Sequence, residues 1–117
     1  DQSSAASDVY KRQGLTNAIV LPPVLNFNLT GMDEKVRRMS EAMQFENHSV
    51  EAFIKNVEQT LDRLDIPKGL NEINVPEDCA ERIAQKAMQD QAYATNPKKA
   101  SLLELKEIVL QSINQAR

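Results

Sequence analysis

The sequence predicts a protein built only of α-helices, and three features support that class. Aromatic residues make up 4% of the 117-residue chain and tryptophan is absent, whereas Ala, Leu, Glu, Lys and Gln are abundant. This composition favours helices over strands. Several segments carry apolar residues at spacings of three and four, which is the period of an amphipathic helix. The length suits one domain, and we expect a bundle of about five helices.

The most apolar stretch, residues 14–28, is predicted to form the central helix. Its apolar residues surround the helix rather than forming one stripe, which indicates burial on nearly every side. The run is too short to span a bilayer. Pro22 and Pro23 cannot donate backbone hydrogen bonds, so the helix is predicted to break between Leu21 and Pro22.

Two helices with clear patterns are predicted next. The first begins at Asp33, its expected N-cap, and ends near residue 44. The second follows the expected cap Ser49 and has the clearest amphipathic pattern in the chain. The expected inner faces are Val36, Met39, Ala42 and Met43 for the first helix, and Val50, Phe53, Ile54, Val57, Leu61 and Leu64 for the second.

Two more helices are predicted after the breaker Pro67. Pro76 fits the first turn of one of them, which should end before a turn over residues 90–99. Ser101 and Glu104 form a capping box that begins the last helix.

The residues themselves carry no recognisable catalytic pattern. His48 is the only histidine and has no partner at ligand spacing, so we expect an exposed loop residue and no metal site around it. Cys79 is the only cysteine and cannot form an internal disulfide. A net charge of -3 argues against a nucleic-acid partner. No membrane-spanning run or signal peptide is recognisable, so we expect a cytoplasmic protein without a membrane partner.

The central stretch also carries a family resemblance. Gly-Leu-Thr-Asn-Ala-Ile-Val-Leu-Pro, followed by Val-Leu-Asn-Phe-Asn, resembles the run after the last metal-binding histidine in iron-containing (group III metal-dependent) alcohol dehydrogenases. In that family a His-Gly dipeptide opens the run, whereas here Gln13 precedes Gly14. The motifs at residues 64–67, 74–78 and 94–97 also resemble closing elements of the family, in the same order.

Residues 1–13 are interpreted as a non-native, disordered tail, because residues 3–13 resemble a translated sequencing adapter. The domain would then comprise residues 14–117, as the truncated C-terminal helical domain of such a dehydrogenase. The family's fold for this domain is dehydroquinate synthase-like. The histidine expected before Gly14 would have been lost with the missing part of the protein.

The resemblance implies a parent enzyme that interconverts a primary or small alcohol and its aldehyde or ketone. It implies NAD or NADP in an N-terminal nucleotide-binding domain, and Fe²⁺ or Zn²⁺ held by an aspartate and three histidines. It also implies that the parent is a homo-oligomer. These ligands lie upstream of Gly14, so no catalytic, cofactor-binding or metal residue is assigned here. The fragment alone is expected to lack metal, cofactor and activity, and to aggregate or oligomerise through exposed apolar surface.

Four residues are weaker site candidates through the resemblance. Thr16 and Asn17 either support the metal ligands or make helix-start hydrogen bonds. Ala92 and Tyr93 either line the substrate pocket or pack at a helix C-terminus. An alternative function is a free-standing helical module that binds a partner peptide or helix.

Overall fold

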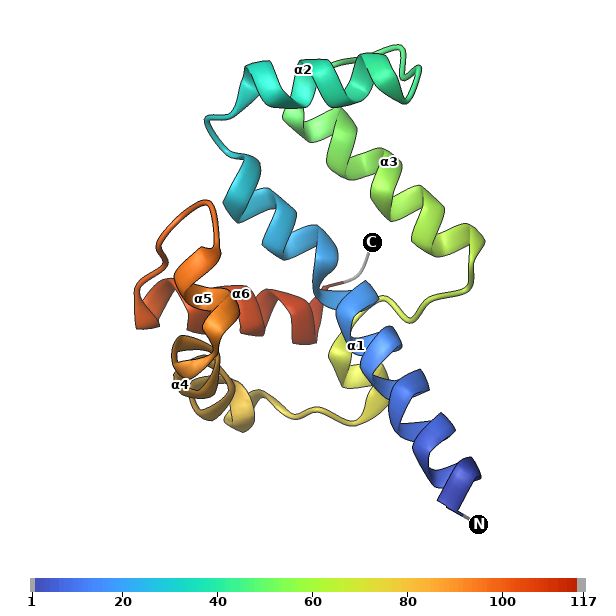
Figure 1. Cartoon of the computed structure of the whole chain (residues 1–117), viewed down its shortest axis with the longest axis vertical. Coiled ribbons are helices and arrows are strands. Elements are labelled where there is room, and N and C mark those ends of the chain that lie inside the picture. Colours follow the sequence, from blue (N-terminus) through green and yellow to red (C-terminus); the bar gives the residue numbers. More distant parts are fainter. Residues whose placement is uncertain (1, 116–117) are drawn as a thin grey trace.

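The computed structural model describes the backbone of residues 2–115 and the side chains of residues 13–90 and 93–115. Within those residues it contains α-helices and 3-10 helices but no strand, so the all-α prediction is confirmed (Figure 1). The elements in chain order are α1 (Gln2–Leu29), α2 (Asp33–Ala42), α3 (Val50–Arg63), η1 (Leu70–Ile73), η2 (Glu77–Cys79), α4 (Ala80–Gln89), α5 (Gln91–Thr95) and α6 (Leu102–Asn114).

Helix α1 connects two groups of helices (Figure 1). Its C-terminal part packs with α2 and α3 around a buried cluster of Leu29, Val36 and Phe53. Its middle packs with α6 and η1 around a second buried cluster, which contains Ile19 and Ile113. The apolar stretch therefore lies between the two clusters. It is not buried on nearly every side as predicted, because Leu21 is 38% exposed and most of its other apolar residues are only partly buried.

The predicted break at Pro22 is wrong, because α1 continues through both prolines, which are buried. Pro23 has no N–H for the carbonyl of Ile19, four residues earlier. The side chain of Gln115 fills this role, since its Nε2 donates to the Ile19 carbonyl oxygen at 2.6 Å. A contact from the far end of the chain thus compensates for a lost helical hydrogen bond.

The start of α1 also differs from the sequence prediction. The helix extends back to Gln2, over backbone that was expected to be disordered. This segment contains neither glycine nor proline, and adding turns to an existing helix costs much less than nucleating a new one. The non-native origin of residues 1–13 stays a prediction.

Local capping signals were predicted with mixed success. The Ser49 side chain accepts from the Ala52 N–H at 3.1 Å, and the Ser101–Glu104 capping box forms, so both predictions are confirmed. Asp33 does not cap α2; it is the first residue of the helix and Met32 holds the cap position.

The inner faces and the ends of helices differ from prediction in several places. Helix α2 ends at Ala42 and turns Ser40 inward, whereas Ala42 and Met43, predicted on its inner face, are exposed. Leu64, predicted on the inner face of the next helix, follows the end of α3 and is also exposed. The short helix α5 forms inside the segment predicted to be a turn. None of the described helices is both long and apolar enough to cross a membrane.

Candidate functional site

A cleft of about 450 Å³ lies between α1, α4, α5 and α6. Helices α1 and α4 both pack on α6, which also lines the cleft. The apolar lining consists of Val20, Val24 and Phe27 from α1, Ala87 from α4, Ala100, and Leu105 and Ile108 from α6. The polar lining consists of Asn17, Asn28, Asp90, Tyr93 and Asn96.

The sequence explains why this cleft is apolar. Val20, Val24 and Phe27 are spaced by four and three residues, so they lie on one face of α1. Leu105 and Ile108 share a face of α6 for the same reason. The cleft is therefore a consequence of two apolar helix faces meeting.

An amide pair fixes one end of the cleft. Asn28 and Asn96 exchange two hydrogen bonds: Asn28 Nδ2 donates to Asn96 Oδ1 at 3.1 Å, and Asn96 Nδ2 donates to Asn28 Oδ1 at 2.8 Å. Lys98 lies beside this pair and donates from Nζ to the carbonyl oxygens of Phe27 and Thr30, both at 3.0 Å. A cation at a helix C-terminus stabilises the last carbonyls. The segment after α5 is thereby tied to the end of α1.

Tyr93 contributes an apolar wall, because its hydroxyl is already used elsewhere. The Tyr93 Oη donates to the carbonyl oxygen of Ala100 at 2.6 Å, and Ala100 is buried. Lys99 Nζ lies 5.9 Å from the centroid of the Tyr93 ring. The ring is thus held in place at the cleft by contacts on its hydroxyl and its face.

The structure brings two of the four sequence-predicted site residues together. Asn17 and Tyr93 line the same cleft, although 76 positions separate them in the sequence. Thr16 is not among the lining residues, and the side chain of Ala92 lies outside the described residues.

Sequence reasoning missed the Asn28–Asn96 pair, which helps to shape the cleft. The available signal was weak: Asn28 is a polar residue at the end of an apolar run, and Asn96 precedes a proline. Neither feature shows that the two amides meet.

The described residues do not form a metal centre. No group of three or more His, Cys, Asp and Glu side chains among them is arranged to hold a metal ion. His48 lies in the loop between α2 and α3, where its Nε2 is 3.0 Å from the carbonyl oxygen of Phe45. It is half-buried rather than exposed as predicted. The donor set that iron or zinc requires is therefore not supplied by these residues.

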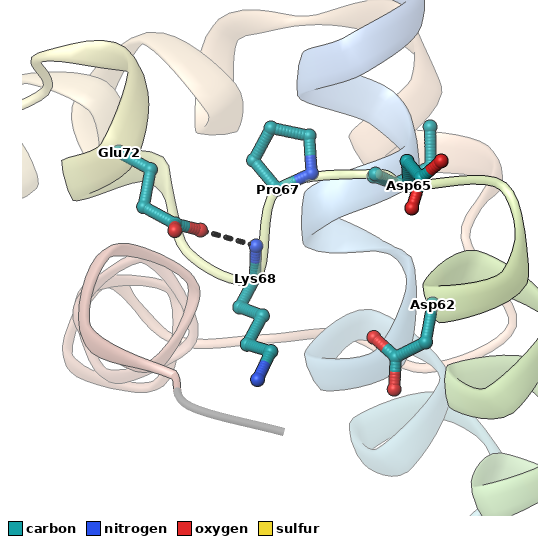
Figure 2. A pocket seen from close by; sticks show the side chains of 6 residues that line it. Asp62, Asp65, Pro67, Lys68 and Glu72 are labelled. Atoms are coloured by element: carbon teal, nitrogen blue, oxygen red, sulfur yellow. Dashed lines mark hydrogen bonds between the residues drawn. The ribbon is translucent and has the colours of Figure 1, made fainter.

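A second cavity, an open depression of about 700 Å³, has acidic side chains but a structural role (Figure 2). Figure 2 shows Glu72 turned towards the backbone nitrogen of Lys68. The same carboxylate accepts from the Gly69 N–H at 3.2 Å. Glu72 thus caps the 3-10 helix η1, so we do not consider this depression the functional site.

Comparison with known proteins identifies the family. Residues 10–113 match the family model described as "Fe-containing alcohol dehydrogenase family, C-terminal". The match begins inside the segment predicted to be non-native. The chain is 32% identical over 104 residues to 4-hydroxybutyrate dehydrogenase of Cupriavidus necator, an alignment that covers 86% of this chain and 27% of that protein.

A second relative is the NAD-dependent methanol dehydrogenase of Bacillus methanolicus, with 30% identity over 115 residues, covering 92% of this chain and 30% of that protein. The chain thus spans less than a third of the length of either relative. Two dehydrogenases and a family model over most of the chain confirm the resemblance inferred from the sequence. The chain belongs to the Fe-containing alcohol dehydrogenase family, where it corresponds to the C-terminal helical domain.

Proposed function

We propose that the chain is the C-terminal part of a metal-dependent, NAD(P)-linked alcohol dehydrogenase. The parent enzyme interconverts a primary or small alcohol and its aldehyde or ketone by hydride transfer. The family match over residues 10–113 carries this proposal. Two relatives named as dehydrogenases support it, one of them named as NAD-dependent.

Within this proposal, the cleft forms part of the wall of the substrate site. Its volume of about 450 Å³ is in the range of small-molecule sites. Val20, Val24 and Phe27 offer an apolar surface for the carbon chain of an alcohol. Asn17 has an exposed side chain at the cleft that can hydrogen-bond a hydroxyl group. Tyr93 limits the length of the chain that fits.

The metal and nucleotide belong to the part of the parent outside this chain. Because the described residues do not provide a metal centre, we place the ligands of Fe²⁺ or Zn²⁺ upstream of Gly14, together with the domain that binds NAD or NADP. A bound divalent metal supplies Lewis-acid chemistry at the alcohol oxygen. Thr16 is proposed to support the metal ligands and Ala92 to line the substrate pocket, and the 117-residue chain alone is proposed to be inactive.

The proposed partners follow from the same division. The chain would dock against the nucleotide-binding domain and the metal-bearing helices of the parent, which we propose is a cytoplasmic homo-oligomer without nucleic-acid or membrane partners. Large apolar side chains on the surface, including Leu64 at 65% and Leu103 at 67% exposure, offer apolar contact area.

A chimera tests the proposal. Residues 14–113 replace the matching segment of the Bacillus methanolicus methanol dehydrogenase, and reduction of NAD is followed with methanol and longer primary alcohols. We expect turnover, and we expect Tyr93→Ala to change the ratio of kcat/KM between long and short alcohols. Gln85→Ala, on the exposed face of α4, is the matched control and should leave that ratio unchanged. A folded chimera that binds NAD and metal but shows no turnover would contradict the proposal.

A further inference from the structure

We propose that Gln115 is a positioning residue that keeps α1 continuous at its two prolines. The C-terminal segment 113–115 would then act as a clamp on the helix that forms one wall of the cleft. The clamp itself does not depend on the proposed enzymatic function; only its consequence for the substrate site rests on that function.

The first observation is that α1 lacks two backbone hydrogen bonds at its prolines. Pro22 and Pro23 remove the N–H groups that would bond the carbonyls of Ala18 and Ile19. Helices bend most easily where such bonds are missing. Gln115 Nε2 lies 2.6 Å from the Ile19 carbonyl oxygen and so replaces one of the two missing donors. Figure 1 shows the end of α6 reaching the middle of α1.

The second observation is that the clamp is itself held by other elements. Ile113 is 1% exposed and belongs to the core cluster around Ile19. Asn114 Nδ2 donates to Glu77 Oε1 at 2.7 Å. A Cβ atom on Gly69 would lie only 2.6 Å from the carbonyl oxygen of Ile113 and 3.0 Å from that of Gln115.

These contacts hold the backbone that carries Gln115 against α1 and η1. The glycine lets the backbone before η1 approach the end of α6 closely, and a side chain that leaves an ordered, packed backbone loses less entropy when it forms a hydrogen bond. The Gln115 amide therefore belongs to a fixed part of the fold.

The position of the prolines gives the clamp a functional consequence. Asn17 and Val20 line the cleft before the prolines, whereas Val24 and Phe27 line it after them. A bend at the prolines would move these two pairs relative to each other. Gln115 therefore sets the shape of the cleft without touching a ligand.

A double-mutant cycle on the 117-residue chain tests the clamp by amide hydrogen exchange. Gln115→Met keeps the side-chain length and removes the donor. We expect it to lower the protection of the α1 amides at residues 17–21 about fivefold, the effect of one net hydrogen bond. Amides of α3, which packs on the other part of α1, are the internal control and should change less than about twofold.

The prolines supply the second arm of the cycle. Pro23→Ala restores an N–H for the Ile19 carbonyl, so in that background Gln115→Met should lower the protection of the α1 amides less than about twofold. Pro22→Ala is the matched control, because its N–H would bond the Ala18 carbonyl instead. In the Pro22→Ala background, Gln115→Met should still lower the protection of these amides about fivefold. If the Pro23→Ala chain fails to fold, Gln115→Arg, which keeps a donor, should retain protection that Gln115→Met loses.

The proposed clamp would be overturned if Gln115→Met lowered the protection of the α1 amides equally in the Pro23→Ala and Pro22→Ala backgrounds. A loss of protection spread equally over α1 and α3 would also overturn it. The methanol dehydrogenase chimera, extended to residue 115, then tests the consequence: Gln115→Met should alter the preference between long and short alcohols. If the double-mutant cycle gives the expected result but the chimera is inactive, the clamp is supported and the proposed function is contradicted.

Discussion

Replacing Ser40 with alanine should stabilise the chain. Ser40 lies on α2 with 0% of its surface exposed, and among the described residues its Oγ has no hydrogen-bond partner. A buried hydroxyl without a partner costs about 1–3 kcal/mol. Alanine also has a helix propensity about 0.5 kcal/mol better than serine. We therefore expect a gain of about 1.5 kcal/mol, which raises Tm by about 6 °C for a chain of this length.

Ser112 is the matched control for this substitution. It is also 0% exposed and lies in a helix, α6, but its Oγ donates to the Ile108 carbonyl oxygen at 2.8 Å. Ser112→Ala loses that hydrogen bond, worth about 1 kcal/mol, and regains about half of it through helix propensity. We expect this variant to be less stable than the wild type by about 0.5 kcal/mol.

Urea denaturation followed by circular dichroism measures both variants under the same conditions. The quantity of interest is the difference between the two free energies of unfolding, about 2 kcal/mol. The same atom is removed from two equally buried positions, so the difference reports the hydrogen bond. The reasoning is refuted if Ser112→Ala stabilises the chain as much as Ser40→Ala does.

Four further substitutions test the backbone, the end of α1 and the surface charges. Gly69→Ala places a Cβ 2.6 Å from the carbonyl oxygen of Ile113 and should lower the free energy of unfolding, measured in urea, by about 1–3 kcal/mol. Gly14→Ala meets no atom within 4 Å and should raise it by about 0.5–1 kcal/mol. Similar effects of the two substitutions would contradict the close approach of Gly69 to the end of α6. Lys98→Met removes two hydrogen bonds to carbonyls at the end of α1 and should cost about 1 kcal/mol in the same assay, and no loss would show that the lysine does not cap the helix. The hydrogen bond and charge of Arg37 lower the pKa of Glu34, so this carboxylate stabilises the fold above its unfolded pKa, and the contribution is lost as the pH falls through its folded pKa. Glu34→Gln should therefore be slightly less stable than the wild type at neutral pH and equal to it in acid; a difference that persists in acid would argue against the ion pair.

Local signals in the sequence predicted the helices where neighbouring residues decide the structure. The capping box at Ser101 and the cap at Ser49 use partners three residues away, so both could be read from the sequence. The continuity of α1 could not be predicted from local signals, because the donor to the Ile19 carbonyl is Gln115, which lies 96 positions further along the chain. The short helix α5 was missed because the segment before Asn96 and Pro97 was interpreted as a turn.

The candidate site was only partly predictable. The family resemblance pointed to Asn17 and Tyr93, and the structure places both at one cleft. It could not indicate the amide pair of Asn28 and Asn96, whose members are 68 positions apart. Contacts of this kind depend on how α1 and the segment after α5 pack, and periodicity within one helix contains no information about that packing.

Sequencing the genomic DNA across the codon for Gly14 most directly tests whether this chain belongs to a longer metal enzyme. We predict a histidine codon in place of the one for Gln13, and a nucleotide-binding domain encoded further upstream in the same frame. A native frame that retains residues 3–13, or that starts close to Gly14, would contradict this prediction. That result would favour a free-standing helical module instead.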